Sequence, residues 1–105
     1  MTGVRAGASP MTVAVTPRRE GQDDTIPLAG EKMSTGAIEQ YVNPLIQQRL
    51  AVLALEGWKA DGATDVLTLW RQGRLACREH ASFWMGTSTY SVTSVTIRVR
   101  RVSPV

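Results

Sequence analysis

Cys77 and His80, the single cysteine and the single histidine of the chain, are the first pair whose types could do chemistry. A zinc site needs four ligands, typically thiolates and imidazoles, and one chain offers only these two. A nucleophile–base pair would need a third group to orient the base, and none stands at a recognisable spacing. On a strand, residues three apart face opposite sides. We therefore expect Cys77 to be a small core residue, His80 to be a surface residue, and the protein to hold no metal and no cofactor.

The carboxylates, glycines and serines give no catalytic pattern either. Asp61 and Asp65 lie four residues apart, and Asp23 is adjacent to Asp24. Catalytic carboxylates must be held rigidly in a cleft, whereas helix capping and solvation explain acids in such loop-like sequence. The glycines form no phosphate-binding loop, and no serine stands in a nucleophile elbow. We therefore expect no enzymatic activity and no small-molecule substrate.

Arginine residues are concentrated in the last third of the chain. The formal net charge is +3, and residues 74–105 carry five arginines with Glu79 as their only acid. Arginine beside an indole suits phosphate pairing and base stacking, and it equally suits a protein interface. A solvated polar surface is the plainer interpretation. The candidate basic surface consists of Arg71, Arg74, Arg78, Trp84, Arg98, Arg100 and Arg101.

The strand that would carry several of these arginines is well defined. From Val95 to Arg100, apolar and polar residues alternate, which is the period of a strand with one buried face. Tyr90 and Val92 share a parity opposite to that of Val95, which predicts a β-bulge near Thr93–Ser94. We therefore expect one long strand over residues 88–101.

Two further strands are predicted before it. Residues 65–71 and 74–85 both alternate, and Gln72-Gly73 would form the hairpin turn between them. A helix over residues 65–84 is the competing interpretation, because Val66 and Leu69 also fit the helical period. Together with the last strand, these segments predict a three-stranded antiparallel meander.

One main helix is predicted over residues 44–56. Asn43 is a good N-cap, Pro44 suits the first helical position, and Gly57 suits the position after the last turn. A lead-in over residues 34–42 could form an earlier turn or a helix that Pro44 kinks. Residues 58–64 then read as a connection.

This helix is apolar on more sides than a single sheet can cover. A stripe from Ile46 to Leu53 repeats at helical spacing, and further apolar residues lie on other sides. Either the N-terminal part of the chain or another subunit must cover them. The candidate partner-binding residues are Leu45, Val52 and Leu55 on the helix, with Val13 and Val15 in the N-terminal part.

Residues 1–33 read as an extended or flexible N-terminal arm, and residues 34–105 as a small α+β domain. Gly, Pro, Ser, Thr and charged residues dominate the arm, so it has little to bury. Residues 11–16 alternate like a short strand, which could add to the sheet of a partner.

The cysteine count, the N-terminal sequence and the length of the apolar runs favour an intracellular protein without a membrane segment. The chain has one cysteine, no visible signal peptide, and a longest apolar run of six residues, Leu50–Leu55, against the roughly 20 that a membrane span requires. We expect it in the cytoplasm or within an intracellularly assembled particle.

These observations predict an α+β protein in which one helix packs on a three-stranded sheet and an arm extends from it. The function we expect is that of a non-enzymatic structural or adaptor subunit, in a homo- or hetero-oligomer, that clasps partners through its arm and apolar helix. A phage-like particle is one concrete form of such an assembly. The alternatives are a small nucleic-acid-binding protein that uses the arginine-rich sheet face, and an inhibitor or regulator of a larger enzyme that uses the same surface.

Overall fold

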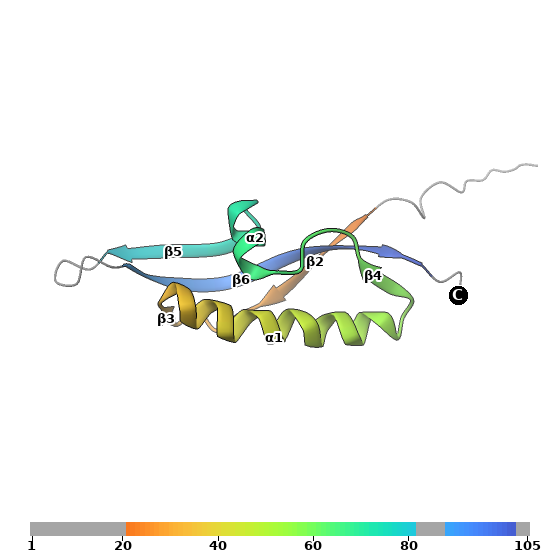
Figure 1. Cartoon of the computed structure of the whole chain (residues 1–105), viewed down its shortest axis with the longest axis horizontal. Helices are drawn as coiled ribbons and strands as arrows, with labels where there is room; N and C mark the ends of the chain where they lie inside the picture. Colours follow the sequence, from red (N-terminus) through yellow and green to blue (C-terminus); the bar gives the residue numbers. More distant parts are fainter. Residues whose placement is uncertain (1–20, 82–87, 103–105) are drawn as a thin grey trace, which may run out of the picture.

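The structure is a computed structural model that describes residues 21–81 and 88–102. Within these residues the protein is α+β, as the sequence predicts, with two helices on a five-stranded antiparallel sheet. Figure 1 shows the longer helix lying along the sheet. The elements are β2 (Gln22–Pro27), β3 (Lys32–Met33), α1 (Thr35–Ala54), β4 (Trp58–Ala60), α2 (Val66–Arg71), β5 (Leu75–Ala81) and β6 (Ser88–Arg101).

β6 is the central strand, because each of the other four strands pairs with it. Val95 of β6 pairs with Ile26 of β2 and with Leu75 of β5, so these two strands flank it on opposite edges. The registers also place β3 on the β2 side and β4 on the β5 side. The predicted hairpin of residues 74–85 and 88–101 corresponds to β5 and β6.

The hydrophobic core lies between α1 and one face of the sheet, with α2 at the edge between β4 and β5. Full burial of each large apolar side chain is worth about 1.5–3 kcal/mol, so this cluster is the main source of stability. No polar or charged side chain in the described parts of the chain is buried. The buried residues are Ile26, Ile38, Val42, Ile46, Leu53, Val66, Leu69, Leu75, Val92, Val95, Ile97 and Val99.

The predicted β-bulge is present. The register of β5 against β6 shifts between Ala76, which pairs with Ser94, and Cys77, which pairs with Val92. The shift leaves Thr93 as the extra residue, so that Val92 and Val95 both face the core although their sequence parities differ.

The predicted start of the main helix at residue 44 is wrong, since α1 begins at Thr35. Ser34 is its N-cap and accepts a hydrogen bond from the Ala37 N–H at 3.2 Å. Asn43 does not cap α1, because its Oδ1 accepts the Val66 N–H at 2.9 Å. Pro44 therefore lies inside the helix, as the lead-in alternative allowed.

The predicted end of this helix is close to the observed one. α1 ends at Ala54 rather than at residue 56, and a turn follows in which the Gly57 N–H donates to the Ala54 carbonyl. Gly57 has a φ of 86°, a backbone conformation that glycine adopts easily.

The predicted strand over residues 65–71 is wrong, because this segment forms α2. The Asp65 side chain caps the helix by accepting the Thr68 N–H at 3.0 Å. At the other end, Gly73 has a φ of 77° and donates to the Trp70 carbonyl, while the Arg74 N–H donates to the Leu69 carbonyl. This is a Schellman motif, so Gln72-Gly73 ends a helix instead of turning a hairpin.

The sheet also takes in segments that were expected to lie outside it. Trp58–Ala60, expected as a connection, pairs with β6. Residues 22–27 and 32–33 of the expected arm pair with β6 as well. The rest of that arm, residues 1–20, lies outside the described residues, as does the expected strand at 11–16. Neither helix in the described parts of the chain combines the length and hydrophobicity that crossing a bilayer requires.

Candidate interaction surfaces

α1 presents a partly exposed apolar surface, which we call the outer stripe: Leu45, Val52 and Leu55. By helical spacing, Leu45 and Val52 lie on one flank of the buried side of α1, and Leu55 is the C-cap residue that follows the last turn. Leu55 is 88% exposed and Val52 is 45% exposed, whereas Leu45 is partly buried. Exposed apolar side chains grouped on one element mark interaction sites. The sequence prediction that this helix has more apolar surface than its own sheet covers agrees with this placement.

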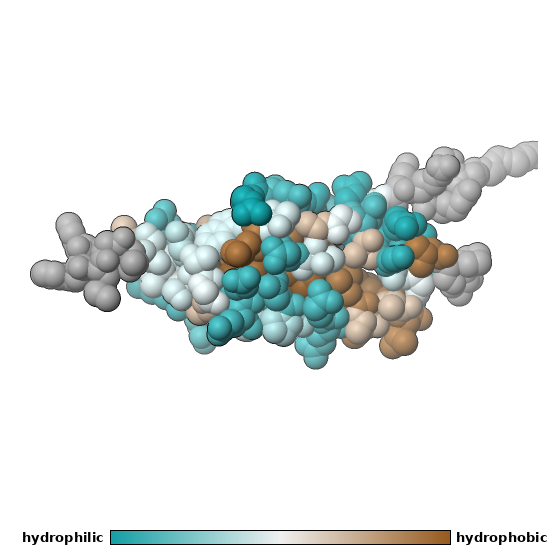
Figure 2. All heavy atoms as spheres, in the orientation of Figure 1, coloured by the Kyte–Doolittle hydropathy of each residue, from teal (hydrophilic) through white to brown (hydrophobic). Residues whose placement is uncertain are grey.

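A further exposed apolar residue, Val102, follows the end of β6. Its N–H donates to the Gly57 carbonyl at 2.8 Å, which holds it beside the turn after the helix. Val102 is 49% exposed. Figure 2 shows apolar atoms gathered over the C-terminal half of α1 and the neighbouring end of the sheet. The other predicted partner-binding residues, Val13 and Val15, lie outside the described residues.

The second candidate surface is the side of the sheet opposite the core, which we call the open face. Because the side chains of a strand alternate, Arg98 and Arg100 project here while Ile97 and Val99 point into the core. Arg74 lies opposite Thr96, and the Arg74 carbonyl accepts a hydrogen bond from the Thr96 N–H. Arg78 pairs with Ser91. Four of the predicted arginines therefore share the open face: Arg74, Arg78, Arg98 and Arg100.

Two lysines that sequence reasoning missed join these arginines. Lys32 pairs with Ser91, and Lys59 pairs with Arg100, so both share the open face with their partners. The signal for them was weak, because the strands that place them contain two and three residues.

Two carboxylates offset part of this positive charge. Asp23 Oδ1 lies 3.2 Å from Arg74 Nη1 and 3.8 Å from Arg98 Nη1. Asp61 Oδ1 lies 4.0 Å from Arg100 Nε. Such partly exposed pairs contribute about 0–1 kcal/mol to stability, but they compete directly with an external anion. Sequence reasoning placed both acids in loops and missed this role.

The neighbouring carboxylate, Asp24, points to the other side of the sheet. It accepts two hydrogen bonds of 2.8 Å from Arg49 of α1, one from Nε and one from Nη2. This pairing raises the pKa of the Arg49 guanidinium, mainly through the hydrogen bonds and the charge of Asp24. The pair ties β2 to α1 and belongs to the fold.

The remaining predicted basic residues do not join the open face. Arg71 lies on α2. Arg101 shares the parity of Val99, and its guanidinium carbon lies 4.4 Å from the centre of the Trp58 ring. Its Nη1 also donates to the Glu56 carbonyl at 3.0 Å, so it secures the end of α1. Trp84 lies outside the described residues.

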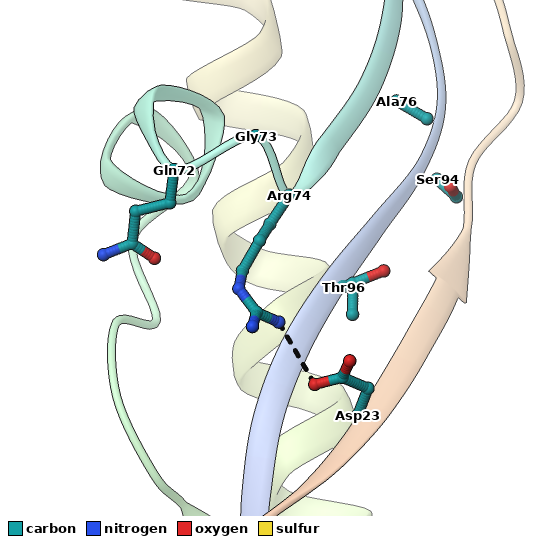
Figure 3. A pocket seen from close by; sticks show the side chains of 7 residues that line it. All are labelled: Asp23, Gln72, Gly73, Arg74, Ala76, Ser94 and Thr96. Atoms are coloured by element: carbon teal, nitrogen blue, oxygen red, sulfur yellow. Dashed lines mark hydrogen bonds and ion pairs between the residues drawn. The ribbon is translucent and has the colours of Figure 1, made fainter.

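The open face is hollowed beside the turn that joins α2 to β5. Figure 3 shows this hollow, about 390 Å³ in volume, with Arg74 reaching across it towards Asp23. A second hollow of about 220 Å³ adjoins it. Both hollows are lined by Gln72 and Arg74. Both hollows are open, and the larger of the two has a mainly polar lining, which suits a charged macromolecular ligand better than an enclosed small molecule.

Cys77 and His80 lie on opposite faces, as predicted. Cys77 packs against the core, and burial is the main cause that raises the pKa of its thiol. His80 Nε2 lies 2.8 Å from Ser91 Oγ on the open face. In the described parts of the chain, no group of three or more His, Cys, Asp or Glu side chains is placed to hold a metal ion.

The two candidate surfaces thus differ in chemistry: the outer stripe of α1 is apolar, and the open face of the sheet is polar and basic. Both belong to regular elements, so both are held in place by the core. Comparison of this chain with protein-family models, with curated proteins and with solved structures gave no match.

Proposed function

We propose that this protein is a non-enzymatic structural or adaptor subunit that binds a protein partner through the outer stripe of α1. The observation that carries the proposal is the exposure of Leu55 and Val52, 88% and 45%, at the C-terminal end of a helix whose buried side already forms the core. Covering a leucine that now lies in water is worth about 1.5–3 kcal/mol. That free energy is gained only on association.

The geometry of the stripe favours binding at low conformational cost. Leu45 and Val52 lie on a 20-residue helix, and Leu55 is its C-cap residue; the helix is fixed to the sheet by the core and by the ion pair between Arg49 and Asp24. A partner therefore meets a surface that is already ordered, which reduces the entropy lost on binding. The helix replaces the N-terminal arm as the main element of the proposal, because residues 22–27 and 32–33 are engaged with β6.

Affinity purification from the cells that naturally express the chain tests this proposal. We expect the wild type and the control variant Gln40→Lys, an exposed change in the N-terminal half of α1, to retain the same partner protein. The double variant Val52→Lys/Leu55→Lys should lose it, and the purified partner should then bind the wild type at least tenfold more tightly than the double variant. Equal retention by all three chains would contradict the proposal.

The identity of the captured partner also separates two forms of the proposal. A structural protein of a particle or complex supports an assembly subunit. An enzyme whose turnover falls when the purified chain is added supports an inhibitor or regulator of that enzyme.

Nucleic-acid binding by the open face is the second candidate function. It is favoured by the six cationic side chains that share this face, against the two carboxylates Asp23 and Asp61. It ranks second because these carboxylates pair with three of the four arginines. Four phosphate contacts would weaken binding about a hundredfold between 50 and 200 mM salt.

Fluorescence anisotropy with labelled single- and double-stranded oligonucleotides tests this second candidate. We expect Arg78→Ala/Arg100→Ala to weaken binding and to reduce its salt dependence. The matched control Arg71→Ala removes an exposed arginine from α2, off the open face, and should bind like the wild type. The absence of binding at about 50 mM salt would remove nucleic acid as a ligand.

A further inference from the structure

Ser91 lies at the centre of a group of cationic side chains on the open face. It pairs with Lys32 of β3 on one side and with Arg78 of β5 on the other. Directly paired residues point to the same side of a sheet, with Cβ atoms about 4.5–5.5 Å apart. His80, the next residue of β5 on this face, has its Nε2 2.8 Å from Ser91 Oγ. We call these four residues, Lys32, Arg78, His80 and Ser91, the Ser91 cluster.

The cations of the Ser91 cluster are not paired with carboxylates, unlike the arginines at the other end of β6. Asp23 and Asp61 pair with the three arginines at that end. Within residues 21–81 and 88–102, Lys32 and Arg78 form no ion pair. Glu79, the acid next to Arg78 on β5, points to the other side of the sheet. An anion that approaches the cluster therefore has no carboxylate to displace.

The hydrogen bond between His80 and Ser91 links the protonation of the imidazole to the hydroxyl group. In a neutral imidazole one nitrogen donates and the other accepts, so either partner can be the donor here. When His80 is protonated, both ring nitrogens donate, so Ser91 Oγ accepts and the hydroxyl hydrogen is free for another acceptor. The charged side chains of the described residues that face His80 are Arg78 and, across Ser91, Lys32, while its partner Thr89 is uncharged. A protonated imidazole therefore gives the cluster one more cation and one more free donor.

The open face is hollowed over the Ser91 cluster. This third hollow has a volume of about 480 Å³, and Arg78, His80 and Ser91 contribute to its lining. It is open to solvent, so a group that belongs to a much larger molecule can enter it. Arginine, lysine and hydroxyl side chains are the usual ligands of nucleic-acid phosphates, and the charge of a phosphate is complementary to that of the cluster.

We propose that the Ser91 cluster binds a backbone phosphate of a nucleic acid, and that protonation of His80 strengthens this contact. The inference rests on the second candidate function, because it names the principal phosphate contact on the open face. The arginines at the other end of β6 contribute less, since a phosphate there competes with Asp23 and Asp61.

Fluorescence anisotropy with a labelled double-stranded oligonucleotide, at about 50 mM salt, tests the proposal. Measurements at about pH 8 and about pH 5.5 span the range in which imidazoles take up a proton, while the phosphodiester charge stays constant. We expect the wild type and the control Arg71→Gln, exposed on α2, to bind about threefold more tightly at the lower pH. His80→Gln retains a donor for Ser91 but no charge, and it should abolish this increase.

The contribution of Arg78 is measured against that of Arg98, which lies on the same face but is paired with Asp23. Arg78→Gln should weaken binding about tenfold and reduce the slope of log K against log salt by about 0.9, as the loss of one phosphate contact requires. Arg98→Gln should weaken binding less than about threefold. His80 is the single histidine of the chain, so its imidazole signals in the NMR spectrum of the untagged wild type identify the site directly. These signals should shift when the oligonucleotide is added.

The outcomes separate the site from the function. No binding at either pH would overturn the second candidate function together with this inference. Binding that is unchanged in Arg78→Gln, or a pH effect that persists in His80→Gln, would overturn the Ser91 cluster as the phosphate contact and leave nucleic-acid binding by the open face standing. His80 signals that do not move in the wild-type complex would overturn the inference as well, and that measurement does not depend on the folding of any variant.

Discussion

Two apolar residues of the same helix, Ile46 and Leu55, should respond very differently to truncation. Ile46 is fully buried, so Ile46→Ala removes core contacts and leaves a cavity, at a cost of about 2–5 kcal/mol. Leu55 is 88% exposed, so only about an eighth of its burial free energy of 1.5–3 kcal/mol is at stake. Leu55→Ala should therefore cost roughly 0.2–0.4 kcal/mol in the isolated chain.

Urea denaturation followed by circular dichroism measures both changes. The protein should be kept at a few micromolar, where association contributes little to the apparent stability. We expect the free energies of unfolding of the two variants to differ by at least about 2 kcal/mol. If Leu55→Ala lost more than about 1.5 kcal/mol at this dilution, Leu55 would be packed within its own chain, and the reasoning for a binding surface would be refuted.

Three further predictions concern single contacts. Arg101→Ala should lower the free energy of unfolding by about 1–2 kcal/mol in thermal denaturation, because the side chain lies over Trp58 and donates to the Glu56 carbonyl; an unchanged midpoint would show that this contact is not formed. Deletion of Thr93 should remove the bulge and restore regular alternation, because Val92 and Val95 would then lie two residues apart and both still face the core; the cost should stay below about 2 kcal/mol, and a deletion that abolished folding would argue against Thr93 as the extra residue. Burial raises the pKa of the Cys77 thiol, so the folded state binds its proton more tightly than the unfolded state does. The resulting stability should be fully present below the ordinary thiol pKa of about 8.5 and should be lost as the pH rises through the folded value. Cys77→Ala should remove this part of the alkaline loss in denaturation series from pH 7 to higher pH, and identical slopes would count against it.

The last strand and its bulge were predictable because their signal is local. Alternation over residues 95–100 identifies one buried face, whatever packs on it. The change of parity between Val92 and Val95 then requires one extra residue, and the structure has it at Thr93. The exposure of the outer stripe was predictable for a similar reason, since a helix has more sides than one sheet can cover.

The identity of α2 was misjudged because six residues fit two periods. Val66 and Leu69 are spaced for a helix, while the same segment also alternates. The deciding signals were at its ends: Asp65, three residues before Thr68, is a helix cap, and Gly73 is the glycine of a helix C-terminus. The residues at the two ends of this segment therefore favour a helix more clearly than the residues within it.

The polar edge strand β2 and the start of α1 depend on distant residues. β2 contains one buried side chain, Ile26, and is held by its ladder with β6 and by the pair between Asp24 and Arg49. No local pattern reveals these partners. Asn43 was a plausible cap by its type, but the tertiary structure uses its side chain for the Val66 N–H of α2.

The basic surface was only partly predictable. Arg98 and Arg100 follow from strand alternation, whereas Arg71 was misplaced with the segment that contains it. Arg101 could have been excluded by its parity, which it shares with the buried Val99. The carboxylates that pair with the open-face arginines come from β2 and from the loop after β4, and their position required the fold.

Thiol labelling at position 55 tests most directly whether the outer stripe is open in the free protein and covered in its assembly. In a Leu55→Cys/Cys77→Ala chain, the rate of maleimide labelling should be close to that of an unfolded peptide when the purified protein is dilute. In the native complex isolated from cells, the same thiol should react at least tenfold more slowly, while a control thiol at Gln40→Cys reacts equally fast in both. Equal labelling of position 55 in the free and the assembled protein would contradict the account.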